Sequence, residues 1–237
     1  YRELDFDLKG KILLGDRSHL TTVYQRVHQR DVPVYHKVAL EDYAINKMDP
    51  QKRELAYARL HQELDNSIFK SAVVTASFQQ QEEGRLLQKN GATLERTEND
   101  KVRTYGFSAE TRTSSGEIWS ANSGVEVYSD KVQSNRTDRD LATNTETANR
   151  GLYPDGATMT SIAAFSMHTL RLDPWEITAG ARFNTFINKV TDSDLGTTKL
   201  TPSALVGNMA VQRRINQSSN VFASINTGFR APNINDL

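Results

Sequence analysis

The side chains that could bind a ligand through a metal ion are few and scattered along this sequence. Tyr35 and His36 are adjacent in V-P-V-Y-H-K-V, and Tyr153 stands in G-L-Y-P-D-G. Tyrosine and histidine can both ligate haem iron, although such residues in loops also commonly pack or are solvated. We take Tyr35, His36 and Tyr153 as the candidate ligand-binding residues, and we predict no metal ion held by the protein itself.

The sequence shows no arrangement typical of an enzyme. It lacks cysteine, which excludes disulfides, thiolate metal sites and cysteine nucleophiles. Its five histidines are dispersed without a His-x-x-x-His pair, and no serine stands in Gly-x-Ser-x-Gly. The 29 basic and 29 acidic residues balance, so there is no electrostatic basis for nucleic-acid binding. We predict a protein without catalytic residues and without a nucleic-acid partner.

The elements that must position these side chains are strands, because alternation of apolar and polar residues dominates the chain. It is clearest in W-E-I-T-A-G-A-R-F, residues 175–183, where every odd position is apolar and every even position is polar or glycine. No window approaches the roughly 18 consecutive apolar residues of a membrane helix. The pattern predicts about ten strands, near residues 4–14, 20–28, 53–64, 72–79, 101–113, 119–127, 158–172, 175–183, 200–213 and 221–229.

The connections between these strands alternate in length. Short turns are expected at Gly15–Ser18, Asp65–Ser67, Ser114–Gly116, Asp173–Pro174 and Arg214–Ser219, and long polar connections at about 29–52, 80–100, 131–157 and 189–199. This sorting predicts an all-β, antiparallel up-and-down meander with the long loops on one side. It is typical of transmembrane β-barrels, which have short periplasmic turns and long extracellular loops.

Several consequences follow from a barrel. Only a closed barrel satisfies every backbone group of a sheet in a membrane, so the polar face would line the lumen. The first connection is short, so we expect it on the periplasmic side, and finding it on the loop-rich side would contradict the predicted register. Trp119 and Trp175 directly follow short turns, where an aromatic girdle would mark the interface; ordinary core tryptophans are the alternative.

Near its end the chain carries a sequence motif that resembles a known family. G-F-R-A-P-N-I-N-D-L is similar to the Phe-Arg-Ala-Pro segment of TonB-dependent outer-membrane receptors, here Phe229, Arg230, Ala231 and Pro232. A-G-A-R-F resembles that family's Gly-x-Arg-aromatic strand. G-V-E-V-Y-S-D-K-V-Q-S, R-G-L-Y-P-D-G and Y-Q-R-V-H-Q-R-D-V-P-V-Y resemble its haemoglobin, transferrin, lactoferrin and haem receptor subgroup.

The resemblance implies a barrel of about 22 strands around a plug domain. Residues 1–237 would then be a partial barrel domain, with the plug, its TonB box and the C-terminal strands absent. Pro232 cannot donate to a strand ladder, so we expect the strand of residues 221–229 to end there. Arg230 would continue its inward face, where it could pair with a plug carboxylate or assist a passing substrate.

The function implied is that of a receptor in the bacterial outer membrane. It would contact outer-membrane lipid, engage the TonB complex through the plug, and import haem, a haem protein or a ferric siderophore as transported ligand, without an intrinsic cofactor. Two alternatives share the strand pattern. One is a passive outer-membrane porin, and the other is a soluble β-rich adhesin or carbohydrate-binding module.

Overall fold

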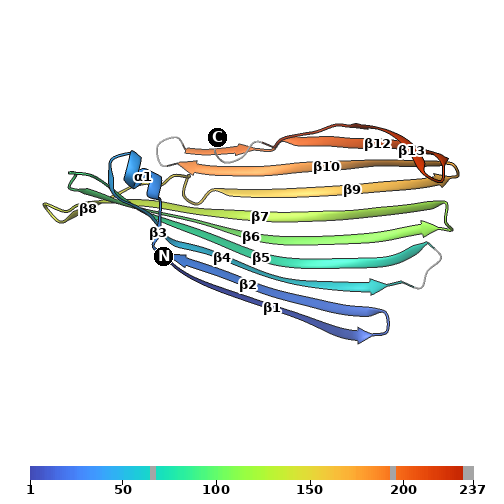
Figure 1. Cartoon of the computed structure of the whole chain (residues 1–237), viewed down its shortest axis with the longest axis horizontal. Helices are drawn as coiled ribbons and strands as arrows, with labels where there is room; N and C mark the ends of the chain where they lie inside the picture. The colour runs from blue at the N-terminus through green and yellow to red at the C-terminus, as the bar shows by residue number, and fades with distance from the viewer. Residues whose placement is uncertain (65–67, 193–195, 232–237) are drawn as a thin grey trace.

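The computed structural model describes residues 1–64, 68–192 and 196–231, and these form one antiparallel sheet (Figure 1). Ten long strands follow one another as neighbours, which confirms the predicted meander. They are β1 (Arg2–Gly15), β2 (Ser18–Arg30), β4 (Tyr43–Glu63), β5 (Phe69–Lys89), β6 (Leu94–Ser115), β7 (Trp119–Asp140), β9 (Thr158–Leu172), β10 (Trp175–Asp192), β12 (Ser203–Asn216) and β13 (Ser219–Asn226).

The two ends of the sheet differ, as the alternating connections predicted. One end carries the tight turns, including the first connection between Gly15 and Ser18, so the first connection lies on the predicted side. The turn predicted at Asp65–Ser67 lies outside the described residues. The other end, the loop end, carries β3 (Val32–Pro33), α1 (Tyr35–Leu40), β8 (Thr145–Arg150) and β11 (Gly196–Leu200) (Figure 1). Among the described residues, no helix has the length and apolarity needed to cross a membrane.

The long polar connections are shorter in the structure than the sequence predicted, because parts of them are strand. Residues 80–100 are mostly the paired ends of β5 and β6, which leave only a short turn between Lys89 and Leu94. Strand β7 likewise continues through Asp140. Cross-strand hydrogen bonds and ion pairs stabilise these extensions, so a segment without apolar alternation still forms a strand. The middle strands therefore project well beyond their apolar part at the loop end.

Strand β13 ends earlier than predicted, at Asn226 rather than at Phe229. The Thr227 amide still donates to the Gly207 carbonyl (2.9 Å), but the Thr227 hydroxyl then accepts from the Gly207 amide (2.8 Å) in place of the backbone. Phe229 lies after the strand with its ring 6.3 Å from that of Phe186. Phe229, Arg230 and Ala231 thus follow the strand instead of forming its tip, and Pro232 lies outside the described residues.

The sheet has one apolar and one polar face, since side chains alternate along each strand and direct cross-strand partners point to the same side. Val74, for example, stands between Leu60 and Ala109, whereas its neighbour Val73 stands between His61 and Glu110. The apolar face carries Phe6, Leu8, Leu20, Ala58, Leu60, Val74, Ala76, Phe107, Ala109, Val125, Val127, Ile162, Ala164, Phe183 and Leu205. The polar face carries Asp5, Asp7, Gln25, Arg53, Arg59, Thr75, Ser77, Gln79, Ser108, Glu110, Glu126 and Arg182.

The sheet encloses almost no core. Among the described residues, the buried apolar side chains are those of Ala121, Val132, Ala157 and Ala163. Many larger apolar side chains are exposed, such as that of Leu205 (73% exposed). Strands β1 and β13 are each paired on one side only. A single open sheet does not bury its apolar face by itself, so this face is available to an apolar environment.

Candidate functional site

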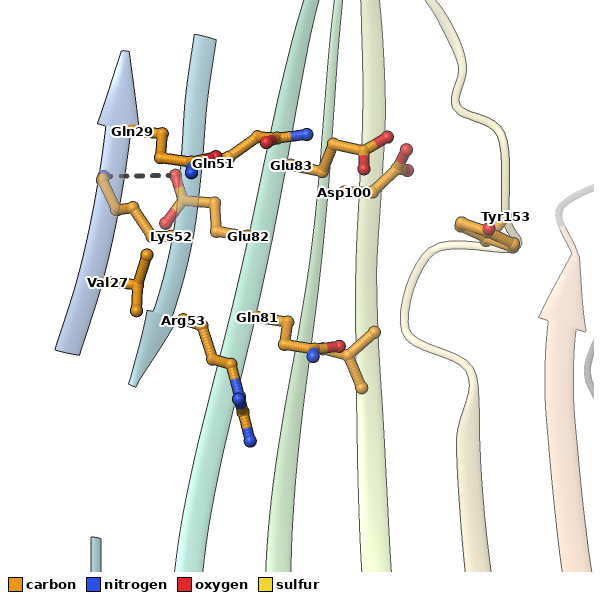
Figure 2. Close-up of a pocket in the computed structure, with 11 residues that line it drawn as sticks. Val27, Gln29, Gln51, Lys52, Arg53, Gln81, Glu82, Glu83, Asp100 and Tyr153 are labelled. Carbon is orange, nitrogen blue, oxygen red and sulfur yellow. Dashed lines mark ion pairs between the residues drawn. The ribbon is translucent and has the colours of Figure 1, made fainter. Parts of the chain in front are cut away.

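The candidate site is a hollow on the polar face at the loop end, with a volume of about 380 Å³ (Figure 2). Gln29, Gln51, Glu83 and Asp100 line it, and the strand register brings them together and continues to Ser134 on β7. Gln29 pairs with Gln51, Gln51 with Glu83, Glu83 with Asp100, and Asp100 with Ser134. We call these five residues the transverse row, since direct partners place their side chains side by side across β2, β4, β5, β6 and β7.

The hollow is polar, with hydrogen-bonding groups on several sides. Arg53, Gln81, Val27 and Val102 line it two residues further along the strands, on the same face, and Tyr153 lines it from the loop between β8 and β9 (Figure 2). Amides, carboxylates, a guanidinium group and a phenol can together orient a polar ligand. The hollow is thus chemically suited to a hydrogen-bonding solute rather than to a wholly apolar one.

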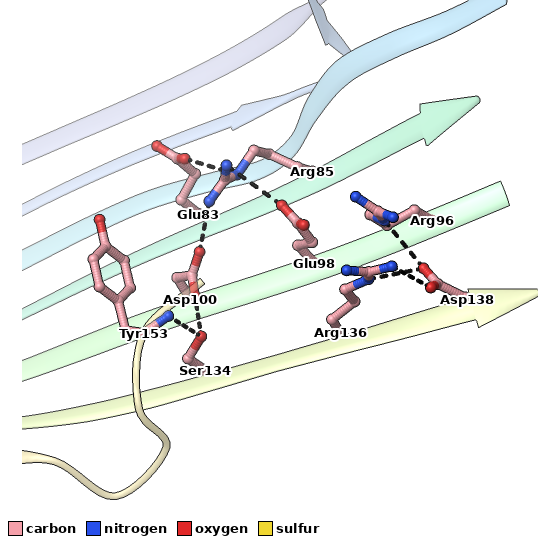
Figure 3. A network of polar contacts seen from close by, with 9 residues as sticks. All are labelled: Glu83, Arg85, Arg96, Glu98, Asp100, Ser134, Arg136, Asp138 and Tyr153. Carbon is pink, nitrogen blue, oxygen red and sulfur yellow. Dashed lines mark hydrogen bonds and ion pairs between the residues drawn. The ribbon is translucent and has the colours of Figure 1, made fainter. Parts of the chain in front are cut away.

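Arg85 organises the acidic side chains beside the hollow (Figure 3). Its guanidinium nitrogens lie 3.2 Å from Glu83, 3.4 Å from Glu98 and 2.7 Å from Asp100. Glu98 and Asp100 are at most 9% exposed, so burial of their carboxyl groups is costly without a polar partner. One arginine shared by three carboxylates holds this edge of the hollow in a fixed arrangement and leaves it net negative.

A second polar network holds the projecting ends of β6, β7 and β8 together (Figure 3). Asp138 accepts hydrogen bonds from Arg136, from Arg96 (3.1 Å) and from Asn149 (3.0 Å). The hydrogen bonds from Arg136 and then Arg96 keep the pKa of the Asp138 carboxyl below its usual range. Charge-assisted bonds to Asp138 therefore stiffen the β7–β8 extension that precedes Tyr153.

The structure separates the three candidate ligand-binding residues. Tyr153 lines the hollow. Tyr35 and His36 begin the short helix α1, where Tyr35 is 77% exposed, and neither lines the hollow. The sequence placed Tyr35 next to His36 but could not show that the β3–β4 connection forms a helix, which carries both away from the transverse row.

The two tryptophans proposed for an aromatic girdle both lie where a strand begins. Trp119 and Trp175 are the first residues of β7 and β10, at the end with the tight turns. The Trp119 indole donates to His168 (3.3 Å), and the Arg213 guanidinium lies 5.1 Å from the Trp175 ring centroid. Polar partners at an aromatic ring suit a boundary between apolar and aqueous surroundings. The girdle itself stays a prediction.

Sequence reasoning missed the transverse row and Arg85. The alternation of Gln79, Gln81, Glu83 and Arg85 on one face was a usable signal, but residues 80–100 were interpreted as a loop, to which no face can be assigned. In the described part of the chain, no group of three or more His, Asp or Glu residues is arranged to hold a metal ion.

The family model described as "TonB dependent receptor-like, beta-barrel" matches residues 6–237. Among solved structures, the copper transporter OprC is similar with a TM-score of 0.79 and 10% identity, over 98% of this chain and 37% of that chain. The FrpB iron transporter from Neisseria meningitidis gives 0.72 and 12%, over 99% and 38%. The unliganded ferric citrate transporter FecA gives 0.69 and 14%, over 94% and 35%. No curated protein matches the chain.

These similarities establish different things. At 10–14% identity the solved structures show a shared fold, and the chain spans little more than a third of their length. The family model covers nearly the whole chain, and it favours a receptor over a passive porin or a soluble adhesin. The chain belongs to the TonB-dependent receptor β-barrel family, whose members are outer-membrane receptors and transporters rather than enzymes.

Proposed function

We propose that the protein is an outer-membrane receptor that imports a polar iron chelate, and that the hollow on the polar face is part of its ligand site. The observation that carries the proposal is the transverse row, which sets hydrogen-bonding side chains of five strands at the loop end of the lumen face. Ligands from outside the cell would meet this end first.

The membrane position follows from the two faces. The apolar face would contact outer-membrane lipid, and the polar face would line a lumen in a larger, closed barrel. As the resemblance implies, a plug domain would occupy that lumen and would couple the receptor to TonB and its energy source. The energised movement would then belong to the plug, while the ten strands described here act as a rigid wall.

The chemistry of the hollow favours a polar ferric chelate over haem. Similar structures are named as transporters of ferric citrate and of iron, and as the ferric yersiniabactin uptake receptor from Yersinia pestis. Among the described residues, Tyr153 is the single aromatic residue that lines the hollow, and the two other haem-ligand candidates, Tyr35 and His36, lie elsewhere. A largely polar lining cannot cover the apolar macrocycle of haem, so haem or a haem protein becomes the second candidate.

The proposal predicts that blocking the hollow abolishes binding. Gln81→Trp places an indole in the hollow, whereas Gln80→Trp changes the adjacent residue on the opposite face. The detergent-solubilised receptor is titrated with ferric citrate, ferrioxamine B and haemin. We expect at least one ferric chelate to bind, and Gln81→Trp to weaken that binding by about 100-fold or more through lost contacts and steric overlap.

Gln80→Trp is the matched control, and it should leave the affinity within about twofold, since a surface change away from the ligand is nearly neutral. Two results would count against the proposal. One is unchanged affinity in Gln81→Trp for every compound that binds, and the other is binding of haemin alone.

A further inference from the structure

The loop that carries Tyr153 is attached to β7 where that strand has β6 on one side but no strand partner on the other. Pairing of β7 with β8 ends at Asn135, and pairing with β9 ends at Lys131. Between them, the loop supplies the missing hydrogen bonds: the Val132 amide donates to the Ala157 carbonyl (2.8 Å) and the Gly156 amide to the Val132 carbonyl (3.0 Å). The loop therefore completes the backbone hydrogen bonding of β7 at this gap in the sheet.

Ser134 joins this loop to the hollow through both its backbone and its side chain (Figure 3). Its amide donates to the Asp155 carboxylate (3.0 Å). Its hydroxyl donates to Asp100 (2.5 Å) and accepts from the Tyr153 amide (3.1 Å), so this one group bonds to both the strand and the loop. Ser134 is only 3% exposed, so none of these groups could turn to water instead.

The close approach of the loop to Ser134 depends on glycine. A Cβ atom on Gly151 would lie 2.1 Å from the Ser134 hydroxyl and 2.7 Å from its carbonyl carbon. Ala157, at the other end of the loop, is completely buried. The loop is therefore packed against the strand at both ends, with Tyr153 between them.

We propose that Ser134 is a positioning residue that fixes Tyr153 as a preformed wall of the ligand site, so that this loop does not close upon ligand binding. The connection runs from Arg85 to Asp100, from Asp100 to Ser134, and from Ser134 to the Tyr153 backbone. A continuous series of polar contacts thereby connects the charged side chains at the hollow to the backbone of Tyr153. This role of Ser134 rests on the proposed function, because it gives Tyr153 a fixed place in the proposed ligand site.

The first test needs no ligand and uses the absence of cysteine from this chain. Tyr153→Cys is introduced into the receptor, and its reaction with a bulky maleimide is timed in intact cells. Adding Ser134→Ala removes the two hydroxyl bonds, and we expect it to increase the labelling rate by about tenfold. Gly151→Ala, which forces the loop off the strand, should increase the rate by at least as much.

Ser129→Ala is the matched control, because Ser129 lies on the same strand and its hydroxyl makes only a 3.5 Å contact with Thr160. It should leave the labelling rate unchanged. In hydrogen exchange, Ser134→Ala should expose the Tyr153 amide while the Gly156 amide, bonded to Val132, stays protected. If Ser134→Ala labels at the control rate and the Tyr153 amide keeps its protection, the positioning role is wrong.

A double-mutant cycle links this position to the ligand. Ferric citrate and ferrioxamine B are titrated against Ser134→Ala, Tyr153→Ala and the double variant. If Ser134 acts through Tyr153, we expect the double variant to bind like Tyr153→Ala alone; additive losses would overturn that link. Faster labelling without binding of either chelate would refute the proposed ligand class alone, whereas chelate binding with control-rate labelling would refute the positioning role alone.

Discussion

We expect Val74→Arg to prevent stable assembly of the receptor in the outer membrane, and Val73→Arg to be tolerated. Val74 lies on the apolar face between Leu60 and Ala109, in the middle of the apolar part of β5. An arginine that faces lipid near the bilayer midplane costs about 2–4 kcal/mol. Val73 lies on the polar face beside Glu110, so an arginine there gains a partner and stays in the lumen.

The two substitutions are matched in residue type, strand and depth, and they differ only in the face that they change. The measurement is the amount of folded receptor recovered from outer membranes, together with its unfolding by urea in lipid vesicles. Equal recovery of both variants would contradict the assignment of the two faces. Loss of Val73→Arg with retention of Val74→Arg would show that the faces are reversed.

Gly84→Ala should destabilise the projecting part of the sheet and disturb the hollow with it. A Cβ atom on Gly84 would lie 2.2 Å from the Asp49 carbonyl oxygen and 2.8 Å from the Pro50 ring. The register between β4 and β5 shifts at this point, between Met48 and Gln51. Because the nearest atom belongs to backbone, the strand must move, and overpacking of this kind costs about 1–3 kcal/mol.

We expect Gly84→Ala to weaken ligand binding as well, because two residues of the transverse row are next in sequence to the residues that clash. Gln51 follows Pro50, and Glu83 precedes Gly84. Thermal unfolding and the chelate titrations measure the two effects. Gly10→Ala is the control, since its Cβ would meet only the movable Thr22 hydroxyl at 3.2 Å. Comparable stability and affinity in both variants would contradict the close packing at Gly84.

Much of the architecture could be predicted from the sequence because apolar and polar residues alternate along much of each strand's apolar part. Residues 175–183 illustrate this, and they form the start of β10 with the predicted faces. Apolar and polar residues alternate where one face of a strand meets lipid and the other meets the lumen. The alternation disappears where both faces of a strand meet water. This is why residues 80–100 were taken for a loop although they are paired strand.

The candidate site was harder to predict because it depends on register. Gln29, Gln51 and Glu83 are far apart in the sequence, and they become neighbours only through the pairing of β2, β4 and β5. Tyr153 was selected from its residue type and its place in a loop, whereas Ser134, whose hydroxyl accepts from the Tyr153 amide, resembles any other strand serine in the sequence. Helix α1 was not predicted, since six residues carry too little periodic signal.

The central claim is that this lumen wall serves energised import of a ferric chelate, and uptake of radioactive iron tests it most directly. Cells that carry the receptor are given iron as ferric citrate or as ferrioxamine B, with and without a functional TonB complex. We expect accumulation of at least one chelate only when TonB is present, and its loss in Gln81→Trp but not in Gln80→Trp. Equal accumulation without TonB, or full accumulation by Gln81→Trp, would contradict the account.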